Sequence, residues 1–268
     1  MPSCNSSGVE IVYDVMGPAG SRKMPVFFIA GLNGMRGSCM KQAVPFAQDR
    51  PVVLHDHRGT GASGKPPGVY SVENMAKDVV AVMDALGIPK AHMVGTSLGG
   101  AIAQVLCLDH PDRVQSAGIL CSYVKMDAFM QRQFEVRKKV LLAMGTEALM
   151  HLTSTTLNDP HWFATHFDEL REREKFLLGN ASPPAIDAER IDAVMRFDRS
   201  ARLGEIRKPC FVIGARNDVV CPPGHSEELA RRIPGARLKL YPDGGHFFYI
   251  VHADELNADI RAFMAQNE

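Results

Sequence analysis

The 268-residue sequence lacks the features that mark a protein for nucleic acid, membranes or export. Its 30 Lys and Arg residues are balanced by 30 Asp and Glu residues, so no net charge would hold it on a polyanion. The start, MPSCNSSGVE, has no basic segment followed by an apolar one, and the longest apolar stretch, MPVFFIAGL, is far shorter than a membrane span. We therefore expect no signal peptide, no membrane contact and no nucleic-acid partner.

Cysteine is also sparse, and its spacing excludes the common metal and redox motifs. The six cysteines are scattered and form no Cys-x-x-Cys pair. Cys107, Cys121 and Cys210 lie in apolar segments, where cysteine usually behaves as a small buried hydrophobe. This pattern predicts free thiols and a cytoplasmic location.

Short apolar runs of strand type alternate with helical patterns along most of the chain. The runs cover residues 10–16, 25–30, 51–56, 90–95, 115–123, 209–215 and 236–242. Helical patterns cover 71–87, 101–110, 226–233 and 253–264. The alternation predicts an α/β fold, with a mostly parallel β-sheet and helices on both faces.

One region interrupts this alternation. Residues 124–203 contain helical patterns, at 129–144, 146–154, 167–178 and 189–197, and no convincing strand. We expect a helical cap insertion there, projecting from a core formed by residues 1–123 and 204–268.

The strongest chemical signal is GTSLGG, which follows the apolar run KAHMV and precedes a helical pattern. Ser97 occupies the centre of G-x-S-x-G, the pattern of a nucleophile elbow, in which a sharp turn between strand and helix exposes a serine. The alternative is a glycine-rich turn with a bystander serine. The strand–turn–helix context favours Ser97 as a nucleophile.

A serine nucleophile needs an acid that orients its base. Asp218 follows the strand-type run FVIGA within a turn, where it could also be only a turn-forming residue. Glu227 and Glu228 are rivals inside a helical pattern, and Asp127 is a weaker candidate after an earlier strand. We predict Asp218 as the acid.

The base is expected in a loop after the last strand, and LYPDGGHFFYIVH offers two histidines there. His246 follows two glycines, and His252 lies near the start of the final helix, as a cap or surface residue would. We predict His246 as the base. The oxyanion hole needs the amide after the nucleophile, that of Leu98, and one from the loop FFIAGLNGM, with Leu32 as the expected donor.

Together these features resemble the α/β-hydrolase fold superfamily over nearly the whole chain. The matching segments are FIAGLNG (28–34), DHRGTGASGKP (56–66), VGTSLGG (94–100), IGARND (213–218) and DGGH (243–246). The chain looks most like small bacterial hydrolases, such as aminoacrylate hydrolases of pyrimidine breakdown and 3-oxoadipate enol-lactonases. One departure is Ala30-Gly31, where many relatives have His-Gly.

The resemblance implies a catabolic serine hydrolase that needs no cofactor and cleaves a small ester, lactone, amide or enamine-type substrate. Two alternatives stay open. The same three residues would serve hydrolysis of a carbon–carbon bond in a ring-fission diketone, and a ligand receptor can be built on a hydrolase scaffold.

Two motifs point elsewhere and are set aside. Gly59, Gly64 and Lys65 reproduce G-x-x-x-x-G-K, but Pro66 follows where a phosphate loop needs a hydroxyl and a helix. The segment instead matches the strand-to-helix turn of the superfamily. His55 and His57 form H-x-H without the further ligands of a metal site, so we expect no metal.

The insertion mixes apolar side chains with cations. The bland interpretation is that the apolar groups pack the cap and the charges face water. The sharper hypothesis is a substrate pocket in which Trp162 supplies an apolar wall and Arg132 or Arg137 holds a substrate carboxylate. The oligomeric state stays open, a homodimer included.

Overall fold

An eight-stranded sheet forms the centre of the protein in the computed structural model, which describes residues 1–32 and 34–268. The strands are β1 (Ser3–Ser6), β2 (Val9–Met16), β3 (Val26–Ile29), β4 (Val52–His55), β5 (Ala91–Thr96), β6 (Val114–Leu120), β7 (Cys210–Ala215) and β8 (Arg237–Tyr241). They lie in the order β1-β2-β4-β3-β5-β6-β7-β8. The β1–β2 and β2–β4 pairs are antiparallel, and every pair from β4 to β8 is parallel. The predicted α/β class is confirmed.

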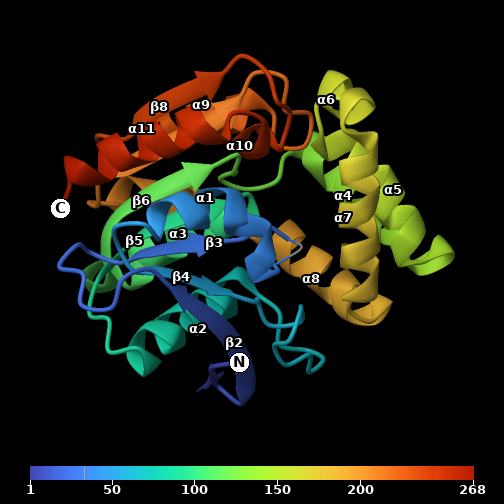
Figure 1. Ribbon diagram of the computed structural model, residues 1–268. Helices are drawn as coiled ribbons and strands as arrows, with labels where there is room; N and C mark the ends of the chain where they lie inside the picture. Colours follow the sequence, from blue (N-terminus) through green and yellow to red (C-terminus); the bar gives the residue numbers. More distant parts are fainter. Residues whose placement is uncertain (33) are drawn as a thin grey trace.

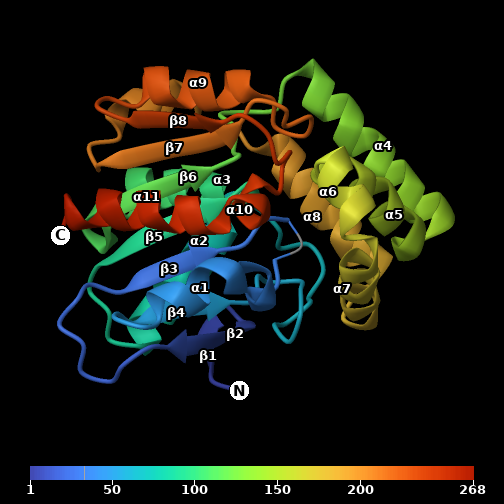
Figure 2. The ribbon, with the colours of Figure 1, turned by 45° about the horizontal axis from the view of Figure 1, so that its top comes forward.

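Helices cover both faces of the sheet, which explains why the parallel strands are apolar without alternation. In β3, Phe27 and Ile29 pack into one apolar cluster and Val26 and Phe28 into another on the opposite face. The first cluster is covered by α2 (Val72–Ala85), α3 (Leu98–Asp109) and α9 (Pro223–Arg232), the second by α1 (Met40–Phe46) and α11 (Ala253–Ala265) (Figure 2).

The element boundaries differ from the sequence prediction in several places, among them α1 and α6 (Pro160–Thr165), which no predicted pattern covers, and the following three. β1 is an additional short edge strand, too brief to show a period. β6 ends at Leu120 rather than at residue 123, because Cys121 has a φ of 38°, which no strand residue adopts. α3 begins at Leu98, since Gly99 and Gly100 are helical despite their low intrinsic propensity.

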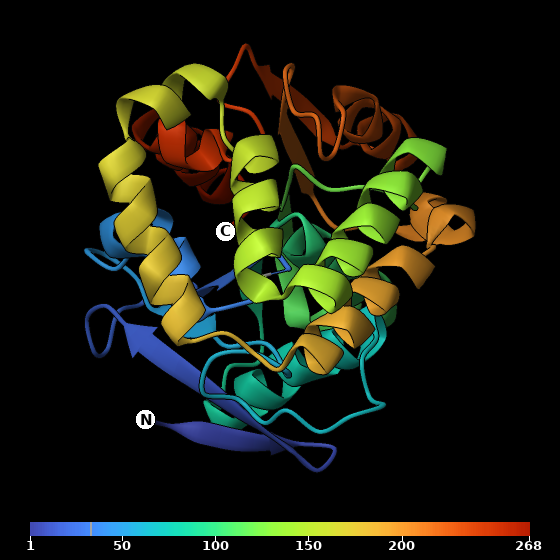
Figure 3. The same cartoon turned by 90° about the vertical axis from the view of Figure 1, so that its right-hand side faces the viewer.

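Five helices follow β6 before the chain returns to the sheet: α4 (Ala128–Met144), α5 (Thr146–Leu157), α6 (Pro160–Thr165), α7 (Phe167–Gly179) and α8 (Pro184–Arg196). They lie together beyond the arrowheads of the parallel strands, at the right of Figure 1, and face the viewer in Figure 3. Lys125 and Asp198 form an isolated antiparallel bridge, so the chain leaves and re-enters the core at one place. We call residues 124–203 the cap segment. Among the residues described, no helix is long and apolar enough to cross a membrane.

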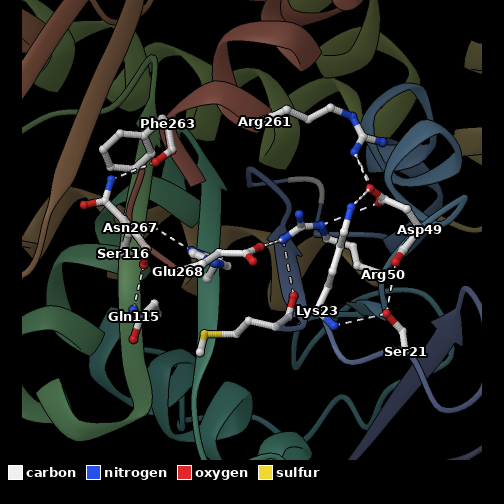
Figure 4. Close-up of polar contacts among 12 residues, drawn as sticks. Ser21, Lys23, Asp49, Arg50, Gln115, Ser116, Arg261, Phe263, Asn267 and Glu268 are labelled. Carbon is white, nitrogen blue, oxygen red and sulfur yellow. Dashed lines mark hydrogen bonds and ion pairs between the residues drawn. The ribbon is translucent and has the colours of Figure 1, made fainter. Parts of the chain in front are cut away.

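A network of charged groups closes the opposite edge of the sheet (Figure 4). Arg50, two residues before β4, donates to the Glu268 carboxylate at 2.8 Å. Asp49 accepts from Lys23 at 2.6 Å and from Arg261 of α11 at 3.1 Å. These contacts tie the end of the chain to the amino ends of the strands, leaving the carboxyl ends free to carry a site.

Candidate active site

Ser97 lies at the sharp turn between β5 and α3 and has a φ of 55°. The turn is so tight that it requires glycine on both sides of Ser97. A Cβ at Gly95 would clash with the Gly99 carbonyl, and one at Gly99 would clash with the Ile29 carbonyl of β3. The Ser97 amide donates to Leu120 O at 2.8 Å, which fixes the turn against β6. The chain thus holds this serine in a strained conformation of the kind that often occurs at functional sites.

Asp218 and His246 form a buried pair at the same edge of the sheet. Asp218 lies three residues after β7, and its Oδ2 accepts from His246 Nδ1 at 2.8 Å. Its other oxygen accepts from the amides of Val220 and Cys221 at 2.8 and 2.9 Å. Both side chains are 4% exposed or less. A carboxylate held in this way keeps the proton of the imidazole on Nδ1 and leaves Nε2 as an acceptor.

Ser97 and His246 line one cavity of about 170 Å³, which the cap helices cover. Gly31 and Leu32 form part of its floor, and a Cβ on Gly31 would lie 3.5 Å from Ser97 Cβ. Within the described part of the chain, no hydrogen bond joins the Ser97 hydroxyl to His246. The structure therefore brings the predicted nucleophile and base to one cavity, with the acid behind the base.

Of the rival acids, Glu227 is exposed, and Glu228, Asp127 and the rival base His252 have other partners. Glu228 pairs with Arg232 on α9 at 2.8 Å. Asp127 caps α4 by accepting from the Met130 amide at 2.8 Å. His252 pairs with Asp243 at 2.7 Å, and the Asp243 side chain is 58% exposed.

Of the two residues predicted to supply oxyanion-hole amides, Leu98 directly follows Ser97 and Leu32 lines the same cavity. Leu98 is the first residue of α3, and the first amides of a helix have no carbonyl partner within it. Leu32 lines the cavity, and the carbonyl of the preceding Gly31 accepts from the Gly34 amide at 2.9 Å.

Of the predicted substrate-binding residues, Arg137 lines the cavity. It is 7% exposed, and its guanidinium lies 4.8 Å from the Phe134 ring centroid and donates to Thr156 Oγ1 at 3.1 Å. Burial lowers the pKa of this guanidinium, and the Asp218 carboxylate only partly opposes that effect.

Arg132 and Trp162 are placed elsewhere. The Arg132 side chain is 80% exposed and pairs with Glu135 at 3.3 Å, one turn along α4. The Trp162 ring stacks on His166 at 4.6 Å. Neither occurs among the described residues that line the cavity.

The sequence analysis does not identify two groups near the site, one on the cavity wall and one beside the acid–base pair. Arg190 of α8 lines the cavity, yet in the sequence this arginine is one charge among several in an amphipathic pattern. Cys121 lies beside the acid–base pair, with donor atoms of Cys121, Asp218 and His246 within 4.8 Å of one another. Burial raises the pKa of the Cys121 thiol well above its usual value, so the thiol stays protonated and is a weak metal ligand.

The fold and this strand–turn–helix site define a class of hydrolases. Residues 24–253 match the family described as alpha/beta hydrolase fold, and the chain belongs to it. It is 34% identical to the protein named carbamate hydrolase RutD of Azorhizobium caulinodans, over 99% of both chains. It is 35% identical to the protein of the same name of Caulobacter segnis, over 95% of this chain and 96% of that one.

Solved structures agree with this assignment. An enol-lactonase from Burkholderia xenovorans LB400 has the same fold, with a TM-score of 0.91, 22% identity and coverage of 98% of this chain and 100% of that one. Est816, described as an N-acyl homoserine lactone degrading enzyme, is 31% identical over 98% of this chain and 100% of its own, with a TM-score of 0.82. The chain is a hydrolytic enzyme of this family, as the sequence predicted.

Proposed function

We propose that the protein is a serine hydrolase in which Ser97 is the nucleophile, His246 the general base and Asp218 the acid that orients it. The observation that carries the proposal is the buried Asp218–His246 hydrogen bond of 2.8 Å beside a cavity that Ser97 also lines. Catalytic hydrogen bonds are often long in an unliganded site and shorten when substrate binds. A contact between Ser97 and His246 is therefore expected in the complex.

The reaction then has two halves. Ser97 Oγ attacks the substrate carbonyl carbon while His246 Nε2 takes the hydroxyl proton, and the carbonyl electrons move to oxygen, which the Leu32 and Leu98 amides stabilise. When the bond to the leaving group breaks, His246 returns the proton to that group. Water, deprotonated by His246, then attacks the acyl-enzyme, and His246 gives that proton to Ser97 Oγ as the acid leaves.

The substrate we propose is a small ester, lactone, amide or enamine-type molecule that carries a carboxylate. Relatives named as carbamate hydrolase and as a lactone-degrading enzyme favour C–N and C–O bonds. The cavity favours a small molecule, and Arg137 is a buried cation on its wall. Among described residues Arg137 has no acidic partner, so a substrate carboxylate would neutralise it.

Two further assignments belong to the same proposal. The cap segment acts as a unit that roofs the site, because its helices supply most of the upper wall of the cavity. A cytoplasmic location suits the cysteines, since all six are free thiols and five of them are buried.

The test is a panel of small esters, lactones, amides and one ring-fission diketone, assayed with wild type and Ser97→Ala. We expect turnover of C–O or C–N substrates, labelling of wild type by a fluorophosphonate, and loss of both in the variant. Cleavage of the diketone alone would indicate a carbon–carbon bond hydrolase. A single burst of product without sustained turnover of any substrate would indicate a receptor.

A further inference from the structure

Three backbone carbonyls around Leu32, those of Ala30, Leu32 and Gly34, bond to groups of other elements. Ala30 O lies 3.0 Å from His57 Nε2, and Gly34 O accepts from the His57 amide at 2.8 Å. Leu32 O accepts from Arg190 Nη2. The first two contacts come from the turn after β4, but the third comes from helix α8 of the cap segment.

The contacts on either side of Leu32 decide where its N–H points. In a trans peptide the C=O and N–H point in opposite directions. The Gly31 carbonyl, bonded to the Gly34 amide, therefore sets the direction of the Leu32 N–H. The bond from Arg190 holds the Leu32 carbonyl, on the other side of the Leu32 Cα. Leu32 is thus restrained on one side by the Gly31–Gly34 bond and on the other by the cap segment.

Arg190 is built for this contact rather than for capture of a second anion. Its side chain is 3% exposed, and Nη1 donates to Asp187 Oδ1 at 3.0 Å, so a carboxylate already offsets its charge. Its methylene chain lies against the turn after β4, since a Cβ at Gly59 would be 2.8 Å from Arg190 Cδ. Nearby, Ser182 Oγ donates to Gly59 O at 2.5 Å. The start of α8 is therefore docked on the core where the loop must be held.

We propose that Arg190 is a positioning residue that holds the Leu32 carbonyl from the cap segment. The Leu32 amide, the expected oxyanion donor, is then aligned only while α8 is docked on the core. The proposal rests on the proposed serine hydrolase function. A bond between a charged donor and a carbonyl is stronger than one between neutral groups, which suits a restraint that must hold as charge develops on the substrate. Displacement of a catalytic group by about 1 Å can cost on the order of 100-fold in rate.

The experiment compares Arg190→Met and Arg190→Lys with wild type on a neutral p-nitrophenyl ester. Arg190→Met removes the donor, and we expect kcat to fall about 10- to 100-fold with KM changed less than about threefold. Arg190→Lys retains one charged donor and should recover part of kcat. Affinity for an alkyl boronic acid, which forms a tetrahedral adduct on the serine, should fall in parallel with kcat.

Arg196→Met is the matched control. Arg196 lies on the same helix and reaches the core through Tyr70 O at 3.4 Å, but it does not line the cavity among the described residues. This variant should retain wild-type kcat and boronate affinity. The melting temperatures of all three variants report any general loss of stability.

The outcomes separate the two proposals. Fluorophosphonate labelling that is absent in wild type would overturn the proposed function and the Arg190 role with it. A labelled wild type whose Arg190→Met variant keeps kcat and boronate affinity would overturn the Arg190 role alone. So would a variant whose only change is a higher KM for carboxylate esters, since Arg190 would then bind substrate directly.

Discussion

The core and the cap segment differ in how tightly the sequence constrains them. In the core, strands such as β3 and β4 are buried throughout, and the turn that holds Ser97 admits only glycine at its flanks. In the cap, large apolar side chains are exposed on several helices, Leu142 and Phe176 each by 60%. The comparison indicates that packing constrains the core, which carries Ser97, more tightly than it constrains the cap segment.

The largest expected effect tests the core half of this contrast. Ser97→Ala should lower kcat by about 10⁵-fold or more, because the nucleophile is lost, while the melting temperature stays near that of wild type. Steady-state assays on a p-nitrophenyl ester measure it. Retention of more than a tenth of the activity would assign the nucleophile to another residue.

Asp218→Asn should lower kcat by about 10⁴-fold, since an amide can leave the proton on the wrong nitrogen of His246. Asp243→Asn is the matched control, because Asp243 also pairs with a histidine, His252 at 2.7 Å, but at the surface. Similar losses in both variants would contradict the assignment of Asp218.

Acid stability should also distinguish the two regions. His55 of β4 is 1% exposed, and burial lowers its pKa to about 4, whereas His161 of the cap is exposed. Because the folded form holds His55 neutral, it binds fewer protons than the unfolded chain, whose histidine has a pKa of about 6.5. The stability associated with neutral His55 is present above about pH 6.5 and is lost as the pH falls toward 4.

His55→Leu should therefore reduce the fall in unfolding free energy between pH 7 and pH 4 by on the order of 2–3 kcal/mol. Urea titrations at a series of pH values measure it. The control His161→Leu removes an exposed imidazole of the cap segment, and an equal effect from both variants would show that burial is not the cause.

The smallest effect concerns selectivity. Arg137→Ala should lower kcat/KM for an ester bearing a carboxylate about 10- to 100-fold more than for a neutral ester of the same size, because a buried charge pair is lost. Arg132→Ala, on the exposed side of the same helix, should change neither. Equal losses on both esters in Arg137→Ala would remove the carboxylate from the proposed substrate.

The same contrast explains what could be predicted from the sequence. Ser97, Asp218 and His246 each follow a strand, and the turn at 97 and the loop before 246 carry glycines. Because the carboxyl ends of parallel strands lie at one edge of the sheet, the sequence pattern alone predicts that these residues meet there. Their catalytic roles stay a prediction until the variants are measured.

The cap could not be predicted in this detail. Helical patterns predict α4, α5, α7 and α8 but not the short α6, and a helical period does not say which face meets the core when no partner surface is known. Arg132 and Arg137 are five residues apart on α4, yet one is exposed and the other lines the cavity. The bond from Arg190 to Leu32 spans 158 positions, and no local pattern announces such a contact.

The glycines around residue 97 also bear on laboratory evolution of this enzyme. A side chain at position 95 or 99 would collide with neighbouring backbone, so libraries that randomise these positions would yield mostly inactive clones. The cap leaves and rejoins the core at the Lys125–Asp198 bridge, so it can be exchanged as one cassette. Under the roles proposed above, a cassette exchanged among relatives would have to keep Arg190 and Asp187, the pair that contacts the Leu32 carbonyl.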